Sequence, residues 1–282
     1  MRRLSLLLAL LFVSSCWLAA ATLQLPERIV AGQEFSVQSS GSGSATFYLF
    51  GPTTAVKRSV RLGTPIKIEG GEVPAAGRYT LVLGHDSATF FVAPGAIANM
   101  AFLARPSRVP AAKTDVVSGT AFVLDRNQNL VLSPQTVTFS LAVPGAPDVR
   151  RSATSRDGVA WTRLDSSKRA GAAQFVVSSG DASVHRVVQE VASEPCNIRM
   201  HAQRGERGTI LVQTDPIRDC AGNPVPDGTI VTFTSVDRSG RNTVDARIKR
   251  GTAQAELPAS DQANISVAAG VVVGNEIRWG GR

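Results

Sequence analysis

The segments DRNQNLVLSPQTVTF at Asp125–Phe139 and DCAGNPVPDGTIVTF at Asp219–Phe233 decide the fold of this chain. They share Asp at the first position, Asn at the fifth and Val-Thr-Phe at the end, with a constant spacing of 94 residues. A second pair of blocks follows in the same order, RDGVAWTRL at Arg156–Leu164 and KRGTAQAEL at Lys249–Leu257, 93 residues apart. This period is too long for a solenoid repeat and matches a β-sandwich module of about 100 residues.

Strand and turn signals continue outside the repeat. Gly222-Asn223-Pro224 supplies the backbone angles that a strand reversal needs, and Thr229–Thr234 behind it alternates like a half-buried strand. The region 22–94 lacks the repeat but contains six short β-prone runs, at Glu34–Val37, Ala45–Phe50, Lys57–Leu62, Ile66–Ile68, Tyr79–Leu83 and Ala88–Val92. The sequence therefore predicts an all-β chain of tandem immunoglobulin-like β-sandwiches after an N-terminal signal peptide.

Two short Pro-containing breaks set the expected domain limits. Pro94-Gly95 separates the first region from the repeat, and Glu194-Pro195 separates the two repeat units. We expect sandwiches at 22–94, 95–193 and 194–282. Because both linkers are short, limited bending between neighbouring domains is expected.

The first residues have the pattern of an export signal. Arg2 and Arg3 are followed by the apolar run Leu4–Val13 and by the small residues Ala19–Ala21, which predicts a signal peptide over residues 1–21. Ten apolar residues are too few to span the roughly 30 Å of hydrocarbon in a bilayer, so an uncleaved membrane anchor is disfavoured.

A second processing route uses the same region. Val13-Ser14-Ser15-Cys16 resembles the lipobox of bacterial lipoproteins, in which residues 1–15 are removed and Cys16 becomes the lipidated first residue. The residues leave both routes open. Either route predicts an exported protein of the periplasm, the cell surface or the secreted fraction, with membrane attachment only through a lipid on Cys16.

Cysteine usage indicates a disulfide. Both processing routes take Cys16 out of the thiol pool, and they leave Cys196 and Cys220 as an even pair in an oxidising compartment. A Cys196–Cys220 bond closes a loop of about 25 residues and stabilises by roughly 3 kcal/mol in the chain-entropy model. The alternatives are a metal site or two free thiols, but no His or second Cys pair lies nearby at zinc-ligand spacing.

The third unit carries a family resemblance. Asp219, Gly222–Pro226, Val231–Phe233 and Gly251–Ala253 stand in the order that resembles the bacterial Ig-like domains of the invasin and intimin type. The middle unit departs at Asn129–Leu132, where the Gly and both prolines are missing. The resemblance implies a spacer or adhesive module on a bacterial surface, with binding confined to particular domains.

No enzyme centre is expected. The chain has three histidines, and we interpret His85, His185 and His201 as solvent-facing polar residues rather than as catalytic bases. Asp125-x-Asn127-x-Asn129 has the spacing that opens a calcium loop, but the later Gly and the bidentate Glu are missing. A turn is the favoured interpretation, and no catalytic residue, metal site or cofactor is predicted.

Two tryptophans are candidate ligand contacts. Trp161 either stacks against a carbohydrate or fills the core, and the core is favoured because Trp161 shares one strand face with Val159 and Arg163. Trp279, close to the carboxyl end, is expected at the rim of its domain.

Charge and composition limit the classes of partner that the chain is expected to bind. Removal of Arg2 and Arg3 leaves 28 basic and 22 acidic residues, and the densest basic clusters are only the pairs Arg150-Arg151 and Lys168-Arg169. Scattered charge of this kind excludes specific nucleic-acid binding and leaves a protein or an anionic envelope polymer as the expected partner. The leading hypothesis is a non-catalytic structural or adhesive envelope protein. An accessory subunit of a secreted assembly and a carbohydrate-binding protein are the alternatives.

Overall fold

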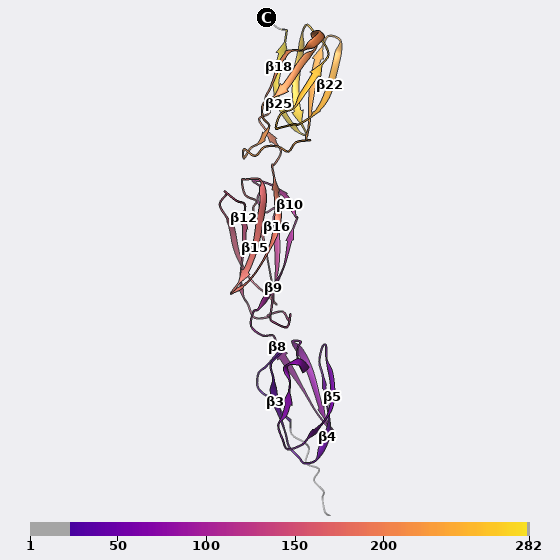
Figure 1. Ribbon diagram of the computed structural model, residues 1–282, viewed down its shortest axis with the longest axis vertical. Helices are drawn as coiled ribbons and strands as arrows, with labels where there is room; N and C mark the ends of the chain where they lie inside the picture. The colour runs from indigo at the N-terminus through magenta and orange to yellow at the C-terminus, as the bar shows by residue number, and fades with distance from the viewer. Residues whose placement is uncertain (1–22, 281–282) are drawn as a thin grey trace, which may run out of the picture. The chain divides into compact units, whose positions relative to one another are not determined.

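The computed structural model describes residues 23–280, and strands joined by turns build nearly all of this range (Figure 1). Its only helical elements are two short 3₁₀ turns, η1 (Gly70–Glu72) and η2 (Glu206–Gly208). Within residues 23–280, no helix has the length and apolar character needed to cross a membrane. The predicted signal peptide and Cys16 lie outside the described residues.

The chain divides into two compact units between Gly95 and Ala96. The first unit is one sandwich with sheets ordered β1-β3-β6 and β2-β8-β7-β4-β5. Its strands are β1 (Leu23–Gln24), β2 (Ile29–Val30), β3 (Phe35–Ser39), β4 (Ser44–Phe50), β5 (Ala55–Arg61), β6 (Ile66–Ile68), β7 (Gly77–Leu83) and β8 (Asp86–Ala93). All six strands expected from the sequence are present, and the two-residue strands β1 and β2 were missed because they are too short to show a period.

The second unit begins with the middle sandwich, whose sheets are ordered β10-β16-β15-β12-β13 and β14-β11-β9. Its strands are β9 (Asn99–Arg105), β10 (Arg108–Pro110), β11 (Val117–Leu124), β12 (Thr136–Ala142), β13 (Val149–Thr154), β14 (Val159–Leu164), β15 (Gly171–Ser179) and β16 (Ala182–Val191). The pairing is antiparallel except between β10 and β16, which run parallel.

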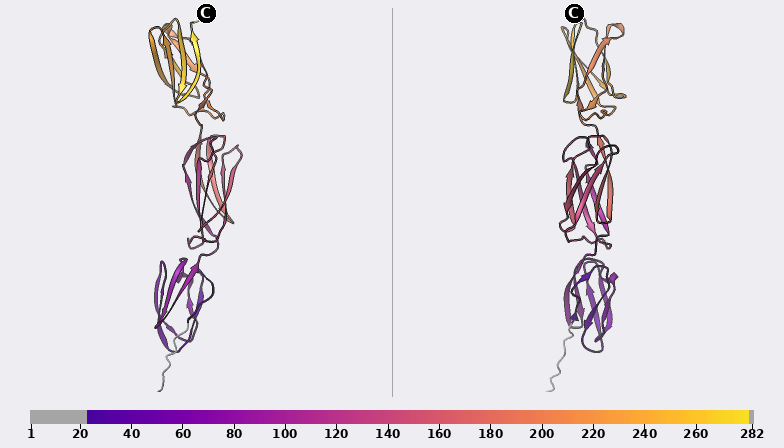
Figure 2. Two further views of the ribbon diagram at one scale, coloured as in Figure 1. Left: turned by 180° about the vertical axis from the view of Figure 1, so that it is seen from behind. Right: turned by 90° about the vertical axis from the view of Figure 1, so that its left-hand side faces the viewer.

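The C-terminal sandwich completes the second unit, with sheets ordered β18-β19-β23 and β22-β21-β24-β25 and the small pair β17-β20 (Figure 2). Its strands are β17 (Pro195–Cys196), β18 (Met200–Arg204), β19 (Ile210–Thr214), β20 (Arg218–Asp219), β21 (Ile230–Asp237), β22 (Gly240–Arg247), β23 (Gln254–Leu257), β24 (Ala263–Ala269) and β25 (Val272–Trp279). The domain limits 22–94, 95–193 and 194–282 remain predictions.

Each sandwich has its own apolar core. The phenylalanines that close the two repeated segments, Phe139 and Phe233, are fully buried at matching places in β12 and β21. In the middle sandwich Phe139 packs with Phe102 and Phe175. A Cβ atom on Gly119 would lie 2.7 Å from Phe175 and 3.0 Å from Phe102, so the three rings require glycine at this position.

Candidate functional site

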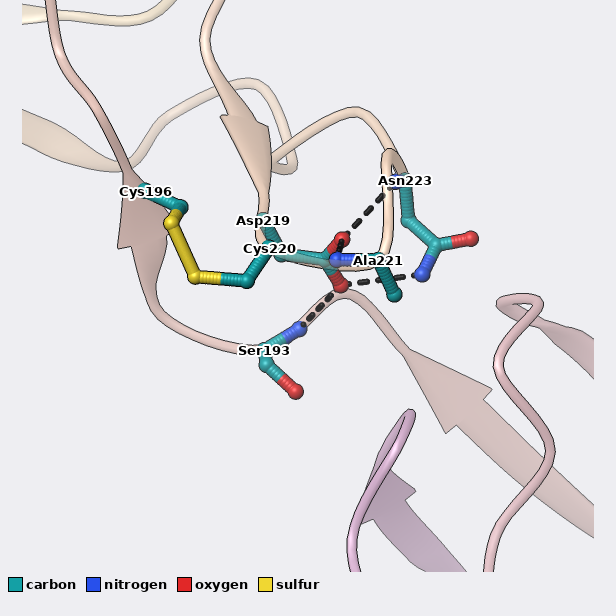
Figure 3. Close-up of a disulfide and its surroundings, with 6 residues drawn as sticks. All are labelled: Ser193, Cys196, Asp219, Cys220, Ala221 and Asn223. Carbon is teal, nitrogen blue, oxygen red and sulfur yellow. Dashed lines mark hydrogen bonds between the residues drawn. A yellow bond between two sulfur atoms is a disulfide. The ribbon is translucent and has the colours of Figure 1, made fainter.

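The loop that follows β20 is organised by one carboxylate. Asp219 is only 4% exposed, and its Oδ1 accepts hydrogen bonds from the backbone N–H groups of Ala221 (2.9 Å) and Asn223 (2.8 Å) (Figure 3). Its Oδ2 accepts from Asn223 Nδ2 at 2.9 Å, and its own N–H donates to the Asn223 carbonyl at 2.9 Å. Asp side chains that satisfy the backbone two to four residues ahead define such a turn.

The middle sandwich contains the same loop after β11. Asp125 Oδ1 accepts from the N–H groups of Asn127 and Asn129, both at 2.8 Å, and Asn129 Nδ2 donates to Asp125 Oδ2 at 3.0 Å. The Asp125 N–H donates to the Asn129 carbonyl at 2.9 Å. The interpretation of this segment as a turn is confirmed. We call residues 125–129 and 219–223 the Asp–Asn loops.

The second Asp–Asn loop also bonds to the middle sandwich. The N–H of Ala170, between β14 and β15, donates to Asn223 Oδ1 at 2.9 Å, and Asn223 Nδ2 donates to the Lys168 carbonyl at 2.8 Å. The linker takes part as well, because the Ser193 N–H donates to Asp219 Oδ2 at 2.9 Å and Ser193 Oγ donates to the Ala111 carbonyl. One loop of the C-terminal sandwich therefore holds both the linker and the β14–β15 loop.

A disulfide closes this arrangement. Cys196 lies on β17 and Cys220 lies inside the Asp–Asn loop, and their sulfur atoms are bonded, as the sequence predicts (Figure 3). The backbones are paired beside the bond, with Pro195 opposite Asp219 and Cys196 opposite Arg218. We call the set formed by the linker 193–196, the loop 219–223 and residues 168–170 the joint.

Two buried carboxyl groups near the joint are shifted in opposite directions. Burial alone raises the pKa of Asp219, but the donors from Asn223, Ser193 and Ala221 outweigh burial and hold that pKa below its usual range. Burial raises the pKa of Glu190. Its Oε2 accepts hydrogen bonds from the N–H (2.8 Å) and the Oγ (2.7 Å) of Ser167, the residue that precedes Lys168 of the joint. Sequence reasoning missed Glu190 because one acidic residue in a strand carries no pattern.

The expectation that Trp161 fills the core is wrong. Its side chain is 66% exposed, whereas Ala160, Thr162 and Leu164 on the other face of β14 are buried. Alternation along β14 separates two faces but does not say which of them points inward. The interior beside β14 is already occupied by large rings, so the strand contributes small and aliphatic side chains to it.

The exposed face of the three-stranded sheet forms ordered rows around Trp161. Thr120 on β11 is paired with Trp161 on β14 at one side and with Leu103 on β9 at the other. Leu103 is 56% exposed, so this row presents an indole and an isobutyl group to solvent. We call the outward side chains of β14, β11 and β9 the Trp161 face.

The next row of the Trp161 face is basic. Ser118 is paired with Arg163 on β14 and with Arg105 on β9, and both arginines are exposed. Neither arginine forms an ion pair with another residue of the range 23–280. No signal in the separate sequence segments could bring Arg105 and Arg163 together, because their proximity depends on strand pairing.

Trp279, the other candidate ligand contact, is half-buried at the end of β25. Its Nε1 donates to the Ser260 carbonyl at 3.0 Å, and its ring packs against the core of the C-terminal sandwich. A shallow polar hollow beside it is lined by Asp237 and Arg238 among others. Trp279 and Trp161 belong to different sandwiches and do not form one site.

The histidines are all exposed, as expected for solvent-facing residues. His201 Nδ1 lies 3.7 Å from Asp215 Oδ1, and both side chains face solvent. Across the part of the chain that the structure describes, no three His, Cys, Asp or Glu side chains gather where they could hold a metal ion.

Comparisons with known proteins give a structural likeness alone. No protein family and no curated protein matches the sequence. The adhesin FdeC of Escherichia coli is 15% identical, with a TM-score of 0.60 over 93% of this chain and 96% of that one. Yersinia pseudotuberculosis InvD is 13% identical (TM-score 0.48, covering 92% and 96%), and the bacterial integrin-binding protein invasin is 12% identical (0.48, covering 92% and 60%). The likeness to FdeC confirms the expected fold of tandem Ig-like sandwiches, as in bacterial adhesins.

Proposed function

We propose that this chain is a non-catalytic structural or adhesive protein of a bacterial envelope, which holds a protein or polymer partner. The joint is the observation that carries this proposal. A protein that connects a partner to a surface must transmit force through its linkers, and here four hydrogen bonds from three side chains and one covalent bond reinforce a linker. The fold shared with the E. coli adhesin FdeC supports the same role.

Export is part of the proposal. The Cys196–Cys220 bond requires an oxidising compartment to persist, and the predicted signal sequence would deliver the chain to one. Cleavage after Ala21 would give a diffusible protein, whereas a lipid on Cys16 would give a membrane-attached one.

The intact mass of the chain from its own host tests export and attachment. Mass spectrometry of membrane and soluble fractions, before and after reduction, is expected to give a chain that starts at Thr22 or at lipid-modified Cys16 and that gains about two mass units on reduction. A full-length chain with free thiols at Cys196 and Cys220 in the cytoplasmic fraction would contradict the proposal.

Adhesion itself is tested by deletion and complementation in the same host. Deletion of the chain is expected to reduce severalfold the attachment of host cells to the surfaces that they colonise, and complementation with the wild-type chain should restore this attachment. Complementation with the Cys196→Ala, Cys220→Ala variant should restore attachment at rest but less under flow, because the joint then lacks its covalent bond. Unchanged attachment in the deletion strain would overturn the adhesive role.

A further inference from the structure

We infer that the Trp161 face of the middle sandwich binds an acidic polysaccharide, with a sugar ring on the Trp161 indole and the acid groups on Arg105 and Arg163. The inference rests on the adhesive function proposed above and names the ligand class for one of its domains. It is carried by the exposure of the indole, the row of arginines beside it and the absence of competing charge on these strands.

The indole is placed as a platform. Trp161 is 66% exposed on a sheet face, on an edge strand, with Thr120 and then Leu103 beside it in register. Contact with water is unfavourable for exposed aromatic and aliphatic groups, so a ligand that covers this row with an apolar face of its own gains binding free energy. The C–H face of a sugar ring is such a surface, because its hydroxyl groups point outward from the ring edge.

The arginines lie at the distance that one polymer segment can bridge. Arg105 and Arg163 stand two strands apart, which puts their Cα atoms roughly 10 Å from each other, and they lie about 7 Å along the strands from the Leu103–Trp161 row. A guanidinium group binds a carboxylate or sulfate through two parallel hydrogen bonds. An acidic chain lying across the sheet would therefore meet both cations while one ring stacks on the indole.

The charge of the face selects an acidic ligand. The three strands NMAFLAR, VSGTAFVL and VAWTRL contain Arg105 and Arg163 as their only charged residues and no Asp or Glu. Residues 95–193 as a whole contain eleven Lys and Arg and seven Asp and Glu. Attraction of an anionic polymer is therefore not opposed by a like charge on the strands that would contact it.

The size of the face favours a polysaccharide over a folded protein. The third row of the face is Val159, Phe122 and Ala101. Three strands spaced about 4.8 Å apart and three rows of side chains spaced about 7 Å give a patch whose Cα atoms span roughly 10 Å by 14 Å. A stable protein partner needs about 800 Å² on each side, which is several times larger. A polysaccharide segment of a few sugars fits the patch, and its affinity grows when neighbouring segments bind neighbouring copies.

Binding to defined polymers tests the inference. Titrations of the mature wild-type chain with polygalacturonate, hyaluronate and heparin, monitored by calorimetry and by indole fluorescence, are expected to give binding to at least one of them that weakens between 50 and 200 mM salt. The highly methyl-esterified form of polygalacturonate, which keeps the backbone but loses the charge, should bind at least about tenfold more weakly. Absence of binding to all three acidic polymers would overturn the inference.

Variants of the face locate the binding. Trp161→Ala should lower the affinity about tenfold, Trp161→Phe should lower it less because a smaller ring remains, and Arg105→Gln with Arg163→Gln should lower both affinity and salt dependence. All of these side chains are exposed, so the melting temperature should not change.

Two matched controls separate a site from general attraction. Val187→Ala removes another exposed apolar side chain from the same sandwich, and Arg241→Gln removes an exposed cation from the C-terminal sandwich. Both should bind like wild type. If Arg241→Gln weakens binding as much as the Arg105→Gln, Arg163→Gln double variant does, or if duplex DNA binds as well as the polysaccharides, the attraction is unspecific and the inference is wrong. The adhesive function would still stand if the deletion strain loses attachment.

Discussion

The two Asp–Asn loops are built by the same hydrogen bonds from different residues. Asp125 and Asp219 each accept from the second and fourth following N–H groups, and each is capped by the amide of the Asn at the fifth position. Between them the sequences are Arg-Asn-Gln in one loop and Cys-Ala-Gly in the other. Asp and Asn alone therefore determine the turn, and the intervening positions are free to acquire another role.

In the second loop that role is the joint. Cys220 bonds covalently to Cys196 on the linker, and Asn223 uses the remaining capacity of its amide to hold the β14–β15 loop.

Removal of the carboxylate should be severe in both loops. Asp219→Ala leaves three backbone N–H donors and the Asn223 amide without their acceptor, and we expect the free energy of unfolding of the C-terminal sandwich to fall by about 3–4 kcal/mol. Asp125→Ala should cost a similar amount in the middle sandwich. Urea unfolding of both variants measures this, and a loss below about 1 kcal/mol in either would show that its turn does not depend on the carboxylate.

Loss of the disulfide should affect only the second loop. Cys196→Ala with Cys220→Ala is expected to lower the stability of the C-terminal sandwich by about 3 kcal/mol, because the unfolded chain gains the entropy of a loop of 24 residues' separation. The turn itself should survive, since Asp219 and Asn223 remain. Hydrogen exchange of the Ala221 and Asn223 N–H groups checks this, and their full loss of protection in the variant would mean that the bond, not the carboxylate, forms the turn.

The fourth position of each loop offers a reciprocal exchange. Gln128 and Gly222 both have positive φ, at 66° and 88°, a region that favours glycine. Gln128→Gly should stabilise the middle sandwich and Gly222→Gln should destabilise the C-terminal one, each by about 1 kcal/mol. Thermal melting of the two variants measures the shifts. Changes of the same sign would contradict the equivalence of the loops.

Acidification should act oppositely on the two buried carboxyl groups. The pKa of Glu190 is raised by folding, so its contribution to stability is present at low pH and is lost as pH rises through the folded pKa. The pKa of Asp219 is lowered by folding, so its contribution is present at neutral pH and is lost as pH falls through the folded pKa. Glu190→Gln should therefore remove the fall in the free energy of unfolding that occurs as pH rises through the folded pKa of Glu190, and should leave the effect of Asp219 unchanged. Unfolding curves of the wild type and of this variant from pH 7 to pH 3 check this. If the free energy of unfolding depends on pH equally in both, Glu190 does not contribute to the pH dependence.

The sequence contained enough to predict the turns and the strands but not the surfaces that strand pairing creates. The 94-residue repeat predicts both Asp–Asn loops, and the pair of cysteines left once Cys16 is removed or lipidated predicts the bond between Cys196 and Cys220. The bonds from Asn223 to Lys168 and Ala170 join residues more than 50 positions apart through backbone groups, which carry no sequence signal. Trp161 was assigned to the wrong face because alternation gives two faces without saying which one is inward.

The central claim is that the joint fixes the C-terminal sandwich to the middle one. Nitroxide labels carried by noncanonical amino acids at the exposed positions Val187 and Arg241 leave Cys196 and Cys220 intact, and electron spin resonance then measures the distance distribution between the two sandwiches. We predict a narrow distribution in the wild-type chain and in the Asn129→Ala control. It should broaden strongly when Asn223→Ala is combined with loss of the disulfide. A wild-type distribution already as broad as that of the variant would contradict the claim.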